Sequence, residues 1–342
     1  MPFLSGRSVQ SIQVMIDNKI KYVECEPWMH DHIAELSVML YGGNIDDRKK
    51  SYDHFLCHHY SLKHPPIAVV GLSEKEKVIA FQMYFYWPYK KKDKYFNVYQ
   101  SGNSMVHPSF RGQKIFQKML SIGSEIGLQK KVDFFIGYPV PISYGALIND
   151  GWIKLGNLRW WTKVLRPIGL LKEKYKNVVY DKYEHVGLRV DINKIHYYSN
   201  CNEAGMRMIN SLEFLEWQYA QKEKEHWYYE HQNSECMIVY KLSHAHGYSE
   251  IIIGDSFTIN NKTNMFADTL NKFLNKKNKS LSNIQAISFA SFNPSPSKIR
   301  GLLFNGFVPH KLTAPLLIKP FSKNIQLDKN QWEVSLGDID TW

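Results

Sequence analysis

Hydrophobic and polar positions follow two different periods along the first half of the chain. Stretches with a period of two are typical of strands with one buried face, and stretches with a period of about 3.6 are typical of amphipathic helices. Two apolar runs, 67–72 and 78–87, flank a short polar turn and predict a hairpin. In chain order we expect an edge strand at 19–25, helices at 30–40 and 46–62, and strands at 67–72, 78–87 and 95–106.

The pattern changes after residue 106. Apolar residues recur at helical spacing from Ile115 to Leu128, directly after the short loop 107–114. A strand, a loop and the N-terminus of a helix are therefore expected to meet here. Beyond this helix we expect a strand at 132–138, a helix at 142–149, and two strands at 152–155 and 159–165.

Two segments of the chain, 144–152 and 300–307, are similar in sequence: the first reads YGALINDGW and the second RGLLFNGF. Each follows a strand-like run and a proline-containing loop, and each precedes a final strand. Such an internal match indicates a repeated structural unit. We therefore predict an α/β (α+β) protein with two copies of one fold, residues 1–172 and 173–342. Each copy is expected to have a mixed, mostly antiparallel central sheet flanked by helices.

The composition is that of a folded protein, since hydrophobic residues make up 44% of the 342 residues. The four cysteines form no CxxC pair, so we expect neither a zinc ribbon nor disulfide bonds. Two histidine pairs, His54 with His58 and His244 with His246, have spacings that suit a metal. Because no carboxylate completes either pair, we interpret them as polar surface residues and expect no metal.

The chain is basic, with 43 Lys and Arg against 32 Asp and Glu and a net charge of +11. Such a charge suits nucleic acid, an anionic membrane surface, or an acidic small molecule or carrier. The densest basic runs, 90–94 and 276–279, are expected to lie in solvated loops, which disfavours nucleic acid. No apolar run has the length of a membrane helix, and the first residues lack the order of a signal peptide. We therefore expect no membrane span and a cytoplasmic location.

The loop 107–114 carries the strongest chemical signal. Backbone amides at a helix N-terminus lack partners and the helix dipole is positive there, so phosphate groups bind at such ends. Arg111 and Lys114 add two cations, and Gly112 permits close approach of the backbone. Neither GxxxxGKS/T nor GxGxxG is present, so this is a phosphate-binding loop of another kind.

Residues 106–116 resemble the acyl-CoA loop of the GNAT superfamily of acyltransferases, written Q/R-x-x-G-x-G/A. The resemblance extends from about residue 19 to 165 and, more faintly, over the second half. It implies tandem GNAT-like domains that use acetyl-CoA or another acyl-CoA as donor, and backbone pairing of Met105 and Val106 with the pantetheine arm. The implied ligands of the pyrophosphate are Arg111 and the amides of Gly112, Gln113, Lys114, Ile115 and Phe116.

This sequence departs from the family pattern at two positions. Lys114 stands where the family usually has glycine, and Phe116 where it has glycine or alanine. We expect the Lys114 amide to donate to phosphate if its φ stays negative. The second half has no comparable loop, because residues 254–262 lack an arginine and Asp255 would repel phosphate. One cofactor per chain is therefore expected.

The resemblance also implies catalytic candidates. In the family, a tyrosine on the helix before a Gly-aromatic pair often protonates the departing thiolate; that position here is Leu147, and Tyr144 lies one turn earlier. For removal of the proton from the acceptor amine, the polar part of the central strand contains neither a carboxylate nor a histidine. We therefore propose water relays through Asn103 or Ser104.

Four residues are candidates for contact with the acceptor. Tyr99 and Gln100 belong to the polar strand that faces the cleft in the resembled fold. Asp338 and Asp340 belong to a C-terminal Gly-Asp-x-Asp stretch that resembles the endings of some two-domain GNAT-like proteins associated with bacterial surface-polysaccharide genes. His107, directly before a proline, is interpreted as structural.

These observations favour an acyl-CoA-dependent N-acyltransferase that moves an acetyl or other acyl group to the amine of a small acceptor, such as an amino sugar or a sugar nucleotide. An acyl carrier protein is an alternative donor, because such carriers are acidic. Two other functions remain open: an aminoacyl-tRNA-dependent peptidyl transferase with two GNAT domains, and a degenerate GNAT-like binding protein without catalysis. The oligomeric state is not predicted.

Overall fold

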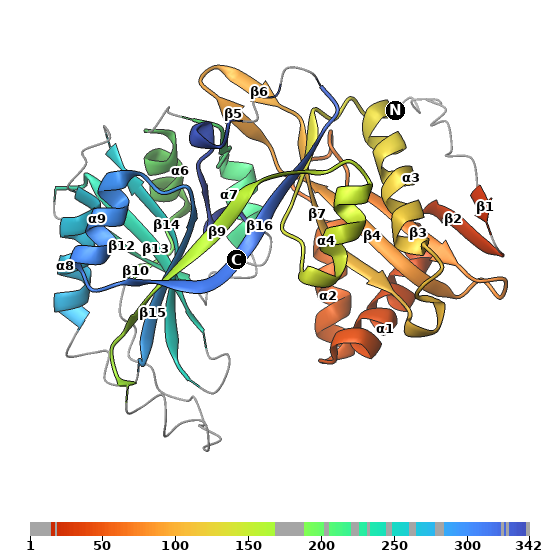
Figure 1. The fold of residues 1–342 in the computed structure, drawn as a ribbon, viewed down its shortest axis with the longest axis horizontal. Coiled ribbons are helices and arrows are strands. Elements are labelled where there is room, and N and C mark those ends of the chain that lie inside the picture. Colours follow the sequence, from red (N-terminus) through yellow and green to blue (C-terminus); the bar gives the residue numbers. More distant parts are fainter. Residues whose placement is uncertain are drawn as a thin grey trace, which may run out of the picture.

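The computed structural model describes residues 15–17, 19–167, 188–201, 205–219, 226–230, 233–243, 248–259, 265–277, 284–322, 325 and 328–339. A long twisted sheet runs through the whole molecule and carries helices on both faces (Figure 1). The elements up to residue 164 make up one half of the molecule and those from residue 188 onward make up the other, apart from their last long strands.

The N-terminal half contains the following elements: β1 (Met15–Asp17), β2 (Ile20–Glu24), α1 (His30–Tyr41), α2 (Ile45–Leu56), β3 (Ile67–Leu72), β4 (Val78–Tyr86), β5 (Tyr89–Lys91), β6 (Lys94–Phe96), β7 (Val98–Val106), α3 (Ile115–Gln129), β8 (Phe134–Gly137), α4 (Pro141–Asn149) and β9 (Ile153–Val164).

The C-terminal half contains these elements: β10 (Leu188–Arg189), α6 (Ile192–Asn200), β11 (Arg207–Met208), α7 (Leu212–Tyr219), β12 (His226–Glu230), β13 (Cys236–Ser243), β14 (Glu250–Thr258), α8 (Met265–Lys277), β15 (Ala286–Phe292), α9 (Pro296–Phe304), β16 (Val308–Pro320) and β17 (Val334–Ser335).

The predicted fold class is confirmed: the sheet is mixed, mostly antiparallel and flanked by helices. Among the described strand pairs, only β7 with β8 and β14 with β15 run parallel. The two halves share one continuous sheet of 14 strands, which the sequence did not predict. Its main path follows the order β1-β2-β3-β4-β7-β8-β16-β9-β15-β14-β13-β12-β10, and β17 pairs with β15 beside this path.

The two halves exchange their last long strands. β16, from the C-terminal half, pairs with β8, and β9, from the N-terminal half, pairs with β15 along its residues 158–164. The two exchanged strands also pair with each other in the middle of the sheet. Because inter-strand hydrogen bonds hold both exchanges, neither half forms a complete sheet from its own residues.

The core is divided between the two faces of the sheet. One hydrophobic cluster is continuous across both halves and lies beneath α1, α2, α6 and α7. On the other face, one cluster lies under α3 and α4 and a separate one under α8 and α9. The continuous cluster therefore joins the halves by burial of apolar surface as well as by strand pairing.

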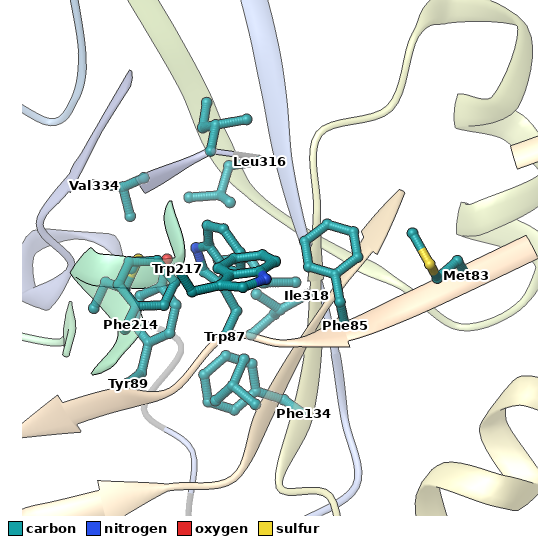
Figure 2. Close-up of a cluster of buried hydrophobic side chains, with 14 of the residues drawn as sticks. Met83, Phe85, Trp87, Tyr89, Phe134, Phe214, Trp217, Leu316, Ile318 and Val334 are labelled. Carbon is teal, nitrogen blue, oxygen red and sulfur yellow. The ribbon is translucent and has the colours of Figure 1, made fainter. Parts of the chain in front are cut away.

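Aromatic side chains dominate this joint (Figure 2). Trp217, on α7, is buried and stacks on His54 of α2, with ring centroids 4.6 Å apart and planes 5° apart. Its Nε1 donates to the carbonyl oxygen of His54 at 3.3 Å. Phe214, one turn earlier on α7, meets Trp87 edge to face at 4.9 Å. Helix α7 thus packs against both α2 and the end of β4.

The internal sequence match corresponds to one repeated turn. α4 ends in a turn in which Gly151 has φ +87°, and α9 ends in one in which Gly306 has φ +77°. In both turns the amide of the following aromatic residue, Trp152 or Phe307, donates to a carbonyl five residues earlier. A positive φ costs glycine little, so the Gly-aromatic pair terminates the helix and buries the aromatic ring at the same point in each half.

Several predicted boundaries were wrong. β2 is not an edge strand, because β1 pairs with its outer side. The segment 95–106 contains two strands, since β5 and β6 form a small hairpin before β7 begins. The two strands expected at 152–155 and 159–165 are one strand, β9, because neighbours on both sides keep its middle extended. α2 ends at Leu56 rather than at 62, and the residues after it turn inward to pack on Trp217.

Candidate functional site

The loop between β7 and α3 is shaped by hydrogen bonds of its own backbone and of His107. The His107 amide donates to the carbonyl oxygen of Ile79 at 2.8 Å, and its Nδ1 accepts from the Ser109 amide at 3.2 Å. The ring therefore caps a short 3-10 turn, Pro108–Phe110, that precedes Arg111. His107 has a structural position, as its place before a proline suggested.

Two residues of this loop adopt left-handed backbone conformations. Gly112 has φ +81°, with open space where a Cβ would lie, and Lys114, the N-cap of α3, has φ +59°. The condition of a negative φ at Lys114, on which we based donation by its amide, is not met. This position requires the conformation that glycine adopts most readily, which explains why a glycine suits it in the resembled loop.

The N-terminus of α3, where the helix dipole is positive, lies at the end of the loop. The first intrahelical bond near this end runs from the Lys118 amide to the carbonyl oxygen of Lys114 at 3.0 Å, so the amides of Ile115 and Phe116 precede the helical bonding pattern. No acidic side chain occupies the first turn of α3. The side chains of Ile115 and Phe116 pack into the cluster under α3, which leaves the backbone of this turn to face the loop.

The exposed Arg111 side chain folds back toward β7. Its Nε donates to the carbonyl oxygen of Val106 at 3.2 Å. Val106 is one of the two residues expected to pair with a pantetheine arm. The guanidinium group therefore lies against the C-terminal end of β7.

β7 and β8 diverge next to this loop. Their parallel pairing runs from Val98 with Phe134 to Ser101 with Gly137. Residues 102–106 continue β7 with pairing to β4 only, within the described part of the chain. This stretch of β7 thus has no second strand partner, and the carbonyl oxygens of Ser104 and Val106 accept from the Tyr41 and Arg111 side chains. The Met105 side chain points into the core and accepts a contact from the Tyr52 hydroxyl at 3.7 Å.

A β-bulge marks the divergence. The register between β4 and β7 shifts so that Gln82 faces both Asn103 and Ser104, and Asn103 takes φ +52°. The buried Gln82 side chain bridges this bulge: its Nε2 donates to Ser101 Oγ at 3.0 Å, and its Oε1 accepts from Ser104 Oγ. Such bulges re-aim backbone groups and are common beside active sites.

Sequence reasoning missed two residues of this region. Gln82 is a polar residue within an otherwise apolar strand. Such a residue in a buried strand indicates that its side chain forms hydrogen bonds inside the protein. Tyr41, at the end of α1, donates its hydroxyl to the carbonyl oxygen of Ser104 at 3.0 Å and is exposed. Its neighbours Gly42 and Gly43, both with positive φ, form the tight link to α2 and bring the α1 end over the bulge.

The structure does not favour acceptor binding by Tyr99 or Gln100. Tyr99 is 1% exposed and Gln100 is 0% exposed. The Tyr99 hydroxyl donates to the carbonyl oxygen of Pro65 at 3.3 Å, and burial raises its pKa well above the usual value. The alternation of β7 turns these side chains toward packed layers, not toward an open surface.

The remaining predicted residues lie apart from the bulge. Tyr144 is half-buried on α4, with the Lys154 ammonium 6.0 Å from its ring centre. Asp338 lies in the C-terminal half, where its carbonyl oxygen accepts from Trp87 Nε1 at 2.8 Å. Burial and the neighbouring Asp255 raise the pKa of Asp338 to about 8. Asp340 lies outside the described residues.

The histidine pairs show no metal geometry in the described residues. His58 Nε2 lies 3.1 Å from Asp53 Oδ2, while His54 stacks on Trp217. His244 and His246 lie outside the described residues. In the part of the chain that the structure describes, no three His, Cys, Asp or Glu side chains gather as metal ligands would. None of the helices described is both long and apolar enough to cross a membrane.

Comparison with solved structures assigns the fold. The structure matches a GCN5-related N-acetyltransferase from Anabaena variabilis with a TM-score of 0.63 and 11% identity, over 89% of this chain and 73% of that one. The chain has the GNAT fold. A probable N-acyltransferase from Enterococcus faecalis matches with a TM-score of 0.61 and 12% identity, over 88% and 72% of the two chains. No family model and no curated protein matches the sequence.

A third structure is that of Saccharomyces cerevisiae N-myristoyltransferase with bound myristoyl-CoA. It matches with a TM-score of 0.59 and 10% identity, over 90% of this chain and 84% of that chain. These identities are low, so the similarity concerns the fold.

Proposed function

We propose that this protein is an acyl-CoA-dependent N-acyltransferase. The observation that supports the proposal most is the combination of a bulged β7, its divergence from β8 after Ser101, and a loop with positive-φ residues that leads into the N-terminus of α3. The solved structures with similar folds include N-acetyltransferases and a myristoyl-CoA complex. We further propose that the chain consists of two GNAT-like units, 1–172 and 173–342, with the boundary outside the described residues.

The residues present fit an acyl-CoA. Arg111 and Lys114 supply cations, Gly112 leaves open space beside the backbone, and the first turn of α3 lacks acidic side chains. We assign the pyrophosphate to Arg111 and to the amides of residues 112–116. We assign the pantetheine arm to the side of β7 that no strand covers at Met105 and Val106, where Arg111 would release the Val106 carbonyl oxygen to the arm. The bound donor would supply an activated thioester carbonyl.

The chain's own groups would then orient the acceptor and move its proton. In our proposal the bulge at Asn103 turns backbone amides toward the carbonyl that accumulates negative charge. Ser104, held by Gln82 and Tyr41, is placed to relay the proton of the amine through water. Tyr144 remains the candidate acid for the thiolate.

For the acceptor we propose a small molecule with a primary amine, such as an amino sugar or a sugar nucleotide of surface-polysaccharide synthesis. The positive charge of the chain suits an anionic acceptor of that kind. It also suits an acidic acyl carrier protein as the physiological donor, which we keep as a variant of the same proposal.

Calorimetry with acetyl-CoA tests the donor site. We expect binding to the unaltered chain and its loss in Arg111→Glu, with Lys118→Glu, one turn into α3, as the matched charge reversal that retains more of the affinity. Release of free thiol in the presence of amino sugars then tests the acceptor. Absence of binding by acetyl-CoA and by longer acyl-CoA thioesters would refute the donor assignment.

A further inference from the structure

A cavity lies in the C-terminal half, away from the loop that precedes α3. Its volume is about 640 Å³, and it is lined by the end of β14, the β15–α9 connection and the segment that contains β17. Phe292, Trp332 and Val334 are buried and form apolar parts of its wall, while Asn293 and Asn330 give it a polar rim. This size and this mixture of surfaces are typical of sites for small molecules.

Next to this cavity, a later segment of the same chain occupies the space between the ends of β14 and β15. β14 and β15 pair in parallel only as far as Ile253 and Phe289, as β7 and β8 do in the other half. Beyond that point β17 pairs with β15, and a short turn, Leu336–Asp338, packs on β14. Gly337 lies so close to Asp255 that a Cβ would be 1.9 Å from its Oδ2. An extended thioester arm therefore has no room here, and the open space lies beside the turn.

Opposite charges line the cavity without meeting. The Lys298 ammonium lies 5.6 Å from the ring centre of Phe266 and 5.8 Å from that of Phe289. Within the described residues it forms no hydrogen bond and no ion pair, and the same holds for the carboxylate of Glu333. Burial lowers the pKa of Lys298 and raises that of Glu333, and each charge partly offsets the shift of the other.

Two more acidic residues line the cavity: Asp338 in this turn and Asp255 on β14. Ser335 Oγ donates toward both Asp255 and Asp338, and the Ser335 amide donates to Asp338 Oδ2 at 2.7 Å. The cavity also has positive groups. Helix α9 begins at the cavity, so the positive end of its dipole adds to the charge of Lys298. Arg207 also lines the cavity, and its Nη1 donates to the carbonyl oxygen of Ser199 at 3.2 Å. The site therefore offers both cationic and anionic groups.

We propose that this cavity binds a zwitterionic small molecule of the α-amino acid class. Its carboxylate would pair with Lys298, and its ammonium with Glu333 and the Asp255–Asp338 pair. The apolar wall at Trp332 would receive an apolar side chain. A ligand with only one of the two charges leaves a buried or half-buried group of the other sign unpaired, which disfavours it. This site is independent of the proposed acyl transfer.

Thermal-shift and calorimetric measurements on the full chain test the proposal, with L-phenylalanine as first probe. Phenethylamine, which lacks the carboxylate, and 3-phenylpropanoate, which lacks the ammonium, are the matched probes. We expect L-phenylalanine to raise the midpoint of thermal unfolding and each matched probe to bind at least about tenfold more weakly, because each forfeits a charge-assisted contact. The other proteinogenic L-amino acids are screened in the same way for their side chains.

Two variants separate the charges. Lys298→Met should reduce the affinity for an amino acid to that for the corresponding amine, and Glu333→Gln should reduce it to that for the corresponding acid. Arg111→Glu should leave amino acid binding unchanged while it abolishes acetyl-CoA binding, so the two proposals fail separately. No shift with any proteinogenic amino acid, or affinity that survives in both variants, overturns the proposal.

Discussion

Lys319 Nζ on the exchanged strand β16 lies 2.6 Å from Asp150 Oδ2 at the end of α4. The same ammonium donates to Ser124 Oγ on α3 at 2.7 Å, and Trp152 Nε1 donates to the same carboxylate oxygen at 3.2 Å. The two charged side chains are only 15% and 13% exposed. A strand from one half of the molecule is thus held to two helices of the other by a partly buried charge network.

Removal of one partner of this pair should destabilise the whole chain. Asp150→Ala leaves the Lys319 ammonium without its counter-charge, and we expect a loss of about 3 kcal/mol in the free energy of unfolding. Asp31→Ala, which breaks the exposed pair of Asp31 with Lys49 at 3.0 Å, is the control and should cost less than about 1 kcal/mol. Urea unfolding measures both, and equal losses would contradict the assignment.

The buried carboxyl groups of Asp255 and Asp338 should make the protein less stable as the pH rises. The pKa of Asp255 is raised to about 6 and that of Asp338 to about 8, in both cases mainly by burial. Both folded pKa values exceed the ordinary value, so this contribution to stability is complete below about pH 4 and is lost as the pH rises through 6 and 8.

Asp338→Asn removes one of these charges while an amide oxygen still accepts from the Ser335 amide. At about pH 8.5 the variant should be more stable than the unaltered chain by at least about 1 kcal/mol, and the difference should shrink toward about pH 5. Asp93→Asn, in the exposed hairpin between β5 and β6, should show no such pH dependence. Thermal unfolding across this pH range provides the measurement, and a difference independent of pH would speak against a buried carboxyl.

His59 should produce the opposite dependence in acid. It is buried beside Trp217, 5.1 Å between ring centres, and burial lowers its pKa from 6.5 to about 4. Because the folded pKa is lowered, its contribution is present above pH 6.5 and is lost as the pH falls through 4. His59→Gln should therefore flatten the stability profile between these values, whereas His32→Gln, on the exposed face of α1, should not.

The left-handed backbone of Lys114 gives a test of the loop geometry. Lys114→Gly relieves a conformation that costs a side-chain-bearing residue about 1 kcal/mol, so the variant should be as stable as the unaltered chain or more stable. Lys118→Gly, inside α3, should instead cost about 1 kcal/mol. A destabilised Lys114→Gly variant would contradict the observed φ. The affinity of this variant for acetyl-CoA separately reports whether the Lys114 ammonium contacts phosphate.

Gln82 should matter for turnover rather than for donor binding, if the proposed function holds. Gln82→Met keeps the volume of the side chain but leaves the hydroxyls of Ser101 and Ser104 without their bridge. We expect kcat to fall at least about tenfold with little change in the KM for acyl-CoA. Gln113→Met, in the loop, is the control and should affect KM more than kcat. A rise in KM alone for Gln82→Met would place this residue outside the catalytic region.

Local patterns predicted the elements that local forces determine. The hairpin of β3 and β4, the helix α1 and the start of α3 at Ile115 follow from apolar periodicity and from the turn between them. The loop at Arg111 stands out in the sequence because its basic residues and its glycine lie within four consecutive positions. The Gly-aromatic repeat was equally visible, since it reflects one helix-ending turn used twice.

Pairing between strands that are far apart in the sequence does not follow from local patterns. Nothing in the sequence of β16 shows that it pairs with β8, and Pro309 and Pro315 within it argue against a central strand. The burial of Tyr99 and Gln100 likewise depends on which layers cover β7. The insertion of β17 between β14 and β15 joins residues far apart in sequence, and no local period reports it.

The strand exchange also sets the order in which the chain can complete itself during synthesis. Synthesis of β8 is complete at residue 137, but the strand that covers its outer side, β16, is complete only at residue 320. Throughout the synthesis of the intervening segment, the first half presents an uncovered β-edge beside an apolar layer, which is the kind of surface that recruits chaperones or self-associates. Ribosome-bound chains that stop before β16 should therefore remain sensitive to protease, and protection should appear only once that strand has left the exit tunnel.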